Sequence, residues 1–446
     1  MIIKFLVDCM MIEPGVLRIR NVFTQNQDTI IRFIYLLGGS VFQLGGLNFI
    51  IFPFLSRYMV IDDFAQVLLL ITIMNFYVSI FCAPFSLVLY RRLGSMEKHD
   101  QAQYAGSLLH IMVAALFVFI TFHMLLHKPI VNALHLTCAR PIMAYALAYM
   151  AFLSVDAFLL VKSQFDFDFR SGFISRIIFF TGTLMTIPAY FAMEEHWMIS
   201  LSVAPLLSIS YLGIQLSGHS RMIFFVRPGL RLVGDSGKDI IMFLMTSLCA
   251  SLLMYSDRWV VALLNVKKDE LAYYLVAVQA SQLVSFPVDR MTELMMPYVG
   301  QLPAMHSLTT AQARKSMILW MSGVAFLATF GVLIGNLFFR LYQPEFLENA
   351  WRYFVVVLIA VICFTGYSFS RAYVLRFFSA SYLTLPFLAA TVVQVTVAVC
   401  LLSIHLDAIG AAYARMFGFM TLGIYYLIVC QRRVIKKAWL TSVASQ

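Results

Sequence analysis

Long apolar runs separated by short polar stretches dominate the chain. A helix needs about 20 mostly apolar residues to cross a hydrocarbon core about 30 Å thick. Runs of this kind occur at about 30–56, 64–90, 104–127, 141–162, 172–192, 196–216, 240–265, 271–297, 313–339, 351–370, 380–404 and 408–430. They are continuous, whereas the strands of a β-barrel are short and alternate in polarity. The pattern therefore predicts an all-α polytopic membrane protein with about 12 transmembrane helices.

The longest polar stretch, 217–239, divides the predicted spans into two sets of six. DDFAQVLLLITIMNFYVSIFCAPF, which begins at Asp62, resembles KDELAYYLVAVQASQLVSFP, which begins at Lys268, because both start with acids and then reach a proline. This echo indicates a parallel repeat and two pseudo-symmetric six-helix bundles. The predicted parts are 1–28 (an N-terminal cytoplasmic or interfacial segment), 29–216 (the first bundle), 217–239 (a cytoplasmic linker), 240–430 (the second bundle) and 431–446 (a basic cytoplasmic tail).

Composition and charge agree with a membrane protein and suggest its orientation. Of the 446 residues 61% are hydrophobic and 12% are charged, about half the charged share of a soluble protein. With the N-terminus inside, the inner segments carry most of the basic residues, among them Arg91, Arg92, Lys162, Arg170, Arg176, Arg227, Arg231, Lys238, Arg432 and Arg433. Cytoplasmic loops hold such an excess, so both termini are predicted to be cytoplasmic. A basic rim facing anionic lipid accounts for the net charge of +10 without nucleic acid.

Two short motifs outside this pattern have an ordinary interpretation. FDFDF places Asp166 and Asp168 on an inner loop, resembling the paired acids with which glycosyltransferases hold a metal and a sugar nucleotide. The loop has no soluble domain around it, so two solvated acids are the favoured interpretation. His123 and His127 have a spacing that metals can use, but interfacial histidines are favoured. We predict no metal site, no cofactor and no enzymatic activity.

Charged residues inside spans are costly and are functional candidates by default. Arg258 and Arg415 lie roughly 6–9 Å to the outer side of the midplane, at about 1.5 Å per residue, and Asp257 precedes Arg258. Adjacent helical residues diverge by about 100°, so Asp257 and Arg258 each need a partner on another helix or water. A water-filled cavity lined by the two arginines would attract an anion, and the guanidinium fork suits phosphate.

A second set of charges lies on the inner side of the midplane: Asp156, Asp289, Arg290 and Glu293. The alternative to a cavity is that all these charges merely hold helices together. We favour the cavity, because a polar contact between membrane helices yields only about 0.6 kcal/mol on average. The predicted anion-binding residues are Arg258, Arg415 and Arg290, and the predicted cavity or ion-coupling acids are Asp257, Asp156 and Asp289.

The stretch SDRWVVALLNVKKDELAYYLVAVQASQLVSFPVDRMTELMMPYVGQLP, from Ser256 to Pro303, resembles polysaccharide transporters of the O-antigen flippase type. These belong to the multidrug/oligosaccharidyl-lipid/polysaccharide (MOP) exporter superfamily. The Asp-Arg pair, the acid-to-tyrosine start of the eighth span, Pro287 and Pro297 have counterparts at the start of their second half, and DDFAQVLLL resembles the matching part of their first half. The chain departs from the family where glycine is common, at Ala65 and Ala272.

The resemblance implies a V-shaped pair of six-helix bundles with a cationic central cavity. Such a protein would move an undecaprenyl-pyrophosphate-linked oligosaccharide from the cytoplasmic to the periplasmic leaflet of the bacterial inner membrane. Its partners would be this substrate, membrane lipids and the polymerase and chain-length proteins of the same pathway. Three rivals remain: a multidrug exporter of organic cations, which the two arginines disfavour, a lipid II flippase, which usually has more than twelve helices, and a membrane glycosyltransferase or polymerase.

Overall fold

The computed structural model describes most of the two predicted bundles. The described residues are 31–92, 96, 98–133, 136, 140–219, 234, 236–301 and 322–426, except for 33, 44, 167, 265, 326–327, 330, 334, 378–380 and 406. Helices make up nearly all of them, and no strand occurs in these ranges. The predicted segments 1–28 and 431–446 lie outside the described residues, as does most of the linker 217–239.

Nine helices in the described part of the chain are long and apolar enough to cross a membrane. They are Ile34–Tyr58, Ile61–Leu89, Asp100–Leu125, Pro141–Gln164, Phe169–Ala192, His196–Gln215, Gly237–Leu263, Pro344–Thr365 and Tyr382–Ile404. Each matches one of the twelve predicted spans, and the all-α membrane class is confirmed. Of the other three, 271–297 lies inside a 34-residue helix, 313–339 lies partly outside the described residues, and 408–430 contains the shorter apolar helix Ile409–Ile424.

The first half of the chain contains η1 (Gly46–Ile51), α3 (Phe52–Tyr58), α4 (Ile61–Arg92), α5 (Lys98–Leu125), α6 (His127–Ala133), α7 (Arg140–Phe165), α8 (Phe169–Leu184), α9 (Thr186–Ala192), η3 (Glu194–Ser202) and α10 (Val203–His219). The second half contains α12 (Gly237–Leu263), α13 (Lys268–Gln301), α15 (Pro344–Phe377), α16 (Ser381–His405) and α17 (Ile409–Ile424). Acids begin α4 and arginines end it, which is the arrangement that the helix dipole favours.

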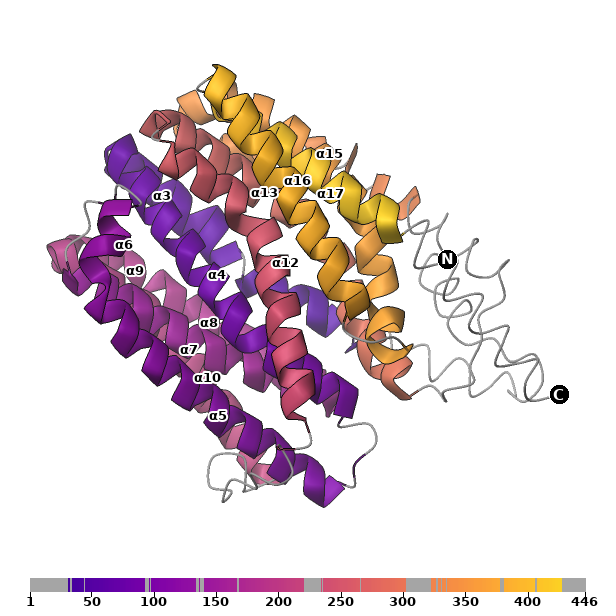
Figure 1. Cartoon of the computed structure of the whole chain (residues 1–446). Helices are drawn as coiled ribbons and strands as arrows, with labels where there is room; N and C mark the ends of the chain where they lie inside the picture. The colour runs from indigo at the N-terminus through magenta and orange to yellow at the C-terminus, as the bar shows by residue number, and fades with distance from the viewer. Residues whose placement is uncertain are drawn as a thin grey trace.

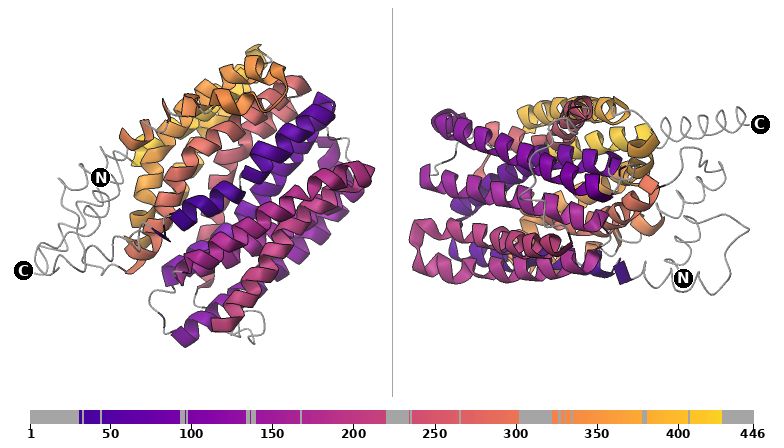
Figure 2. Two further views of the ribbon diagram at one scale, coloured as in Figure 1. Left: turned by 180° about the vertical axis from the view of Figure 1, so that it is seen from behind. Right: turned by 90° about the horizontal axis from the view of Figure 1, so that it is seen from below.

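Helix α4 joins the two halves. It packs against α5 and α7 of the first half and against α12 and α13 of the second, and Figure 1 shows it running beside α12. Seen from behind, the indigo segment that ends in α3 also lies between the magenta helices and the orange ones (Figure 2). The division into bundles at 29–216 and 240–430 stays a prediction. Helix α4 and the segment ending in α3 thus both contribute to the contact between the halves.

The halves meet at the end of the molecule where α4 begins, which we call the outer end after the predicted orientation. The ring of Phe64 packs on Tyr342 and Phe346, with ring centres 6.4 and 5.9 Å away. The Tyr342 hydroxyl donates to the Asn48 carbonyl at 3.2 Å. At the surface, Lys268 Nζ lies 3.8 Å from a carboxylate oxygen of Asp62. We call Asn48, Asp62, Phe64, Lys268, Tyr342 and Phe346 the outer seam.

Polar contacts also join α4 and α12 at the inner end. Arg92 donates to Asp239 at 2.8 and 3.1 Å, and Arg91 Nη1 lies 3.5 Å from the same carboxylate. The hydroxyl of Tyr104 on α5 donates to Ser236 at 2.7 Å. Helix α4 therefore contacts the second half at both of its ends, through α13 and α15 at the outer end and through α12 at the inner end.

Candidate functional site

Arg258 lies buried where α12 faces α4. Its side chain is only 3% exposed. Nη1 donates to the hydroxyl of Thr72 on α4 at 3.4 Å, and the guanidinium carbon lies 4.9 Å from the centre of the Tyr255 ring. Nε and Nη2 have no hydrogen-bond partner among the described residues. A buried charged donor without a partner is costly, and both of these nitrogens can still donate to an acceptor.

Asp257, the neighbour of Arg258, points to a different helix. One of its carboxylate oxygens accepts a hydrogen bond from Arg415 Nη1 on α17 at 3.0 Å and another from the hydroxyl of Tyr274 on α13. Arg415 Nη1 also donates to the carbonyl of Met254 at 2.9 Å. These contacts connect α12, α13 and α17 within the second half. Arg258 and Arg415, predicted to act together on an anion, have different surroundings.

The charges of this cluster do not balance. Asp257 and Arg415 are 0% and 1% exposed, and they form one ion pair. Arg258 adds a second positive charge, and none of the ion pairs formed by the described residues includes it. Removing an uncompensated charge from water costs several kcal/mol, roughly. The layer therefore favours an anion, and Arg258 offers the donors for it.

Asp156 belongs to a separate buried network in the first half. Its carboxylate accepts hydrogen bonds from Arg176 Nη1 on α8 and from the hydroxyl of Ser208 on α10, both at 2.5 Å. Ser175 and Ser208 share a further hydrogen bond. Arg176, counted above among the basic residues of the inner segments, lies within α8 and is only 2% exposed. The predicted start of the fifth span at 172, before Arg176, was the signal that it lies inside.

The remaining predicted residues lie on α13. Asp289 is partly buried and makes contacts of its own. The side chains of Arg290 and Glu293 lie outside the described residues. The structure therefore brings together Asp257, Arg258 and Arg415 and holds Asp156 apart from them. Thr72 and Tyr274 complete the cluster. The sequence analysis missed them, because hydroxyl residues inside spans are too common to be a signal.

The paired acids of FDFDF have local roles. Asp166 pairs with Lys162 of α7 at 2.5 Å. Asp168 is the N-cap of α8, where its carboxylate accepts the amide of Ser171 at 3.1 Å, as cap residues do. No group of three or more potential His, Cys, Asp or Glu metal ligands occurs within the described ranges. These contacts account for both aspartates without a sugar nucleotide.

A second charged cluster lies at the outer end, where α13, α15 and the turn before α17 meet. Arg352 Nη2 donates to Glu270 at 2.7 and 2.9 Å, and its Nη1 lies 3.4 Å from Asp407. The Tyr353 hydroxyl, with one proton to donate, faces both carboxylates. Burial raises the pKa of Glu270, the charge of Asp407 raises it further, and Arg352 lowers it by less.

We expect Glu270→Gln to change how stability depends on pH. Because the folded protein raises the pKa of Glu270, this carboxyl stabilises the fold below its ordinary titration range and loses that contribution as pH rises through the raised pKa. Gln cannot ionise and does not lose this contribution. The difference between the Tm of the variant and the Tm of the wild type should therefore be more positive at pH 7.5 than at pH 4.5. Thermal unfolding in detergent measures this, with Glu348→Gln as control. A relative Tm that falls toward pH 7.5 contradicts it.

Three solved structures show which known fold the chain has. A Vibrio cholerae MATE transporter in the bent form matches with a TM-score of 0.65 at 12% identity, over 93% of this chain and 98% of that one. The lipid II flippase MurJ, inward closed, matches with 0.59 at 12% identity, over 94% and 90%. These likenesses show the fold. A MOP superfamily transporter from Pyrococcus furiosus, described as having a binding pocket of reverse polarity, matches with 0.66 at 13% identity, over 92% and 96%.

No family model matches the chain, and no curated protein matches it. The solved structures show that the chain has the fold of transporters and flippases of the MOP superfamily. Its long apolar helices are those of a multi-pass membrane protein.

Proposed function

We propose that the protein is a flippase that moves a lipid-linked oligosaccharide with a pyrophosphate head group across the bacterial inner membrane. The observation that carries this proposal is the buried guanidinium of Arg258, which has two unpartnered nitrogens and forms no ion pair among the described residues. Pyrophosphate bound to a polyprenyl carrier is an anion that enters from the bilayer, and its oxygens suit the planar donor fork of arginine. The likeness to a lipid II flippase supports the same class of substrate.

The proposed transport cycle uses the contact between the halves. In the proposed cycle the oligosaccharide and its pyrophosphate enter from the cytoplasmic side, while the polyprenyl tail stays in lipid between the bundles 29–216 and 240–430. Rocking of the bundles then opens the outer seam and releases the head group to the periplasmic side. Both chain termini are cytoplasmic in this proposal. The polymerase and chain-length proteins of the pathway would receive the product.

An ion gradient is the proposed source of energy, with Asp156, Asp257 and Asp289 as candidate coupling acids. Asp156 and Asp257 each hold an arginine, Arg176 and Arg415 respectively. A proton or cation that neutralised either carboxylate would release its arginine, and this would couple ion binding to a change in helix packing. For Asp257 the released partner would be Arg415, beside the proposed anion site.

Export of a small organic cation is the second candidate function, because MATE transporters share the fold. The sign of the buried charge separates the two functions: a cation substrate calls for an acid outside any ion pair, whereas among the described residues of this cluster Asp257 is paired with Arg415 and Arg258 has no ion pair. The description of the Pyrococcus furiosus protein indicates that pockets of different polarity occur on this fold. A membrane glycosyltransferase is a weaker candidate, since Asp166 and Asp168 have local roles.

Reconstitution in vesicles tests the proposal. Purified protein is placed in vesicles that contain undecaprenyl-pyrophosphate-linked oligosaccharide, and a lectin added outside reports how much sugar is accessible. We expect accessible sugar to rise with time only in vesicles that contain the protein. Unchanged accessibility, together with uptake of an organic cation by the same vesicles, would establish the second function instead.

We predict that linking the outer seam stops transport. Asp62→Cys and Lys268→Cys, in a background without the native cysteines, are joined by a short thiol reagent that contains a cleavable disulfide. Transport should fall to the rate of protein-free vesicles and recover after reduction, because the seam must open. The matched control links Glu270→Cys to Arg352→Cys, which lie within one half, and should leave transport unchanged. Transport that continues with the seam linked contradicts the rocking cycle.

A further inference from the structure

Two arginines share one aspartate at the inner end of the contact between α4 and α12. Arg92 donates to Asp239 through Nε and Nη2, at 3.1 and 2.8 Å, and both bonds end on the same carboxylate oxygen. Arg91 Nη1 lies 3.5 Å from the other oxygen, which is longer than an ordinary hydrogen bond. We call Arg91, Arg92 and Asp239 the inner clasp. Of its two cations, Arg91 is the one that the carboxylate holds more weakly.

The inner clasp is partly exposed. The side chains of Arg91 and Arg92 are 34% and 38% exposed, and the guanidinium carbon of Arg91 lies 5.9 Å from the centre of the buried Phe243 ring. The residues on either side of Phe243 are exposed and apolar: Ile241, Met242, Leu244 and Met245. On a membrane span such residues are suited to contact lipid. A phosphate group whose hydrocarbon tail stays in the bilayer can therefore reach Arg91 without entering a closed cavity.

The inner clasp lies at one end of the predicted spans. Arg91 closely follows the end of the apolar span Ile61–Leu89, and Asp239 lies in the first turn of α12. Arg258 lies near the opposite end of the same helix. At about 1.5 Å per residue, the inner clasp and Arg258 are separated by most of a hydrocarbon core about 30 Å thick. In the predicted orientation the inner clasp is level with the cytoplasmic head groups, where a lipid-linked substrate begins.

The charge around the inner clasp favours an anion. In the ion pairs of the described residues, Asp239 is the carboxylate of both arginines, and the exposed Lys238 beside it adds another positive charge. The N-terminus of α12 itself favours negative charge, and its N-cap residue, Ser236, makes no cap hydrogen bond. The Ser236 hydroxyl accepts from Tyr104 instead. One carboxylate thus serves two guanidinium groups and a helix N-terminus, and a pyrophosphate, with more charge and more oxygens, suits them better.

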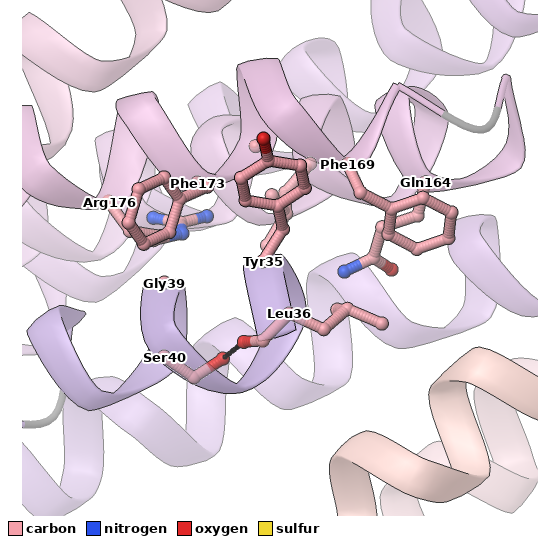
Figure 3. A pocket seen from close by; sticks show the side chains of 10 residues that line it. Tyr35, Leu36, Gly39, Ser40, Gln164, Phe169, Phe173 and Arg176 are labelled. Carbon is pink, nitrogen blue, oxygen red and sulfur yellow. Dashed lines mark hydrogen bonds between the residues drawn. The ribbon is translucent and has the colours of Figure 1, made fainter. Parts of the chain in front are cut away.

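The pair of Arg176 and Asp156 has the opposite arrangement. There one arginine meets one carboxylate at 2.5 Å, and the two side chains are 3% and 0% exposed. Figure 3 shows the Arg176 guanidinium close to the ring of Phe173. A Cβ at Gly39 would lie 3.3 Å from Arg176 Cγ and 3.4 Å from the backbone of Phe173, so the helices pack too closely there to admit a phosphate group. Accessible arginines that share a carboxylate distinguish the inner clasp from this buried pair.

We propose that the inner clasp is the site where the pyrophosphate of the substrate first binds, by displacing Asp239 from Arg91 and Arg92. The inference rests on the proposed flippase function and deepens it, because it adds an entry site to the site at Arg258. While no substrate is bound, Asp239 takes the place of the phosphate and holds α12 against α4. When pyrophosphate replaces it, this contact between the halves is released. Substrate binding is thereby coupled to opening of the inner end.

Two variants with opposite expected effects test the inner clasp. Both are made in full-length Arg258→Ala protein in detergent, so that binding of a short polyprenyl pyrophosphate reports the site that remains. Asp239→Asn removes the competing carboxylate and should tighten binding about twofold to fivefold, the range of a partly exposed ion pair. Arg91→Gln removes a charged donor and should weaken binding at least about threefold. If the inner clasp only holds helices together, both variants weaken the same contact and act in the same direction.

Asp166→Asn is the matched control. Asp166 also pairs with a cation, Lys162, so this variant removes the same charge away from the inner clasp and should leave binding unchanged. Tighter binding by Asp239→Asn cannot arise from loss of folded protein. Effects of equal sign in the two clasp variants, or no effect in either, overturn the entry site, while binding by the wild type keeps the flippase proposal. Displacement of the probe by an equal concentration of phosphatidylglycerol also overturns the entry site, and failure of the wild type to bind the probe overturns both proposals.

Discussion

Replacing Arg258 with alanine should abolish transport of the pyrophosphate-linked substrate and leave the protein folded. Truncating one partner of a buried, hydrogen-bonded charge pair costs about 2–5 kcal/mol, so we expect substrate affinity to fall at least about thirtyfold. Stability should not fall, because the guanidinium makes one long hydrogen bond, to Thr72, and removing its unpartnered donors relieves a penalty of about 1–3 kcal/mol. The vesicle assay and thermal unfolding in detergent measure the two effects.

Two further variants separate charge from geometry at this position. Arg258→Lys keeps the positive charge but replaces the donor fork with a point charge, so affinity for pyrophosphate should be intermediate. Thr72→Val removes the hydroxyl that accepts from Arg258 and should change transport little, since this contact positions the side chain and does not bind substrate. Full transport by Arg258→Ala in protein that unfolds at the wild-type temperature would refute the anion site.

The spans could be predicted from sequence because hydropathy reports a local property. A run of apolar residues must leave water whatever surrounds it, and nine predicted spans recur as helices in the described part. The acids of FDFDF were expected on a loop, and both lie in the short connection between α7 and α8, but the role of Asp168 as the N-cap of α8 was not predicted. Here an aspartate at the boundary of an apolar run was a cap signal.

The partners of the buried charges could not be predicted, because they lie far apart in sequence. The angle of about 100° between adjacent helical residues correctly predicted that Asp257 and Arg258 have different partners. It could not show that the partner of Asp257 is Arg415 on α17. The same holds for Asp156 and Arg176. Which face of each helix points to which neighbour is set by packing between helices, and close contacts such as those at Gly39 are visible only in three dimensions.

Replacing Arg415 with alanine should destabilise the protein, in contrast to Arg258→Ala. Asp257 would be left buried with only the Tyr274 hydroxyl as donor, and removing one partner of a buried ion pair costs about 3–5 kcal/mol. We therefore expect a clear fall in Tm and in membrane abundance, measured by thermal unfolding in detergent and by quantifying the protein in membranes.

The double variant Asp257→Leu, Arg415→Met decides between a structural and a binding role for Arg415. Replacing both members of a buried pair with apolar residues of similar size is often neutral, so the double variant should recover most of the lost stability. If it also recovers transport, Arg415 holds α17 against α12 and Arg258 alone binds the anion. If stability returns and transport does not, the pair belongs to the transport machinery. An Arg415→Ala variant as stable as Arg258→Ala would contradict the distinction between the two arginines.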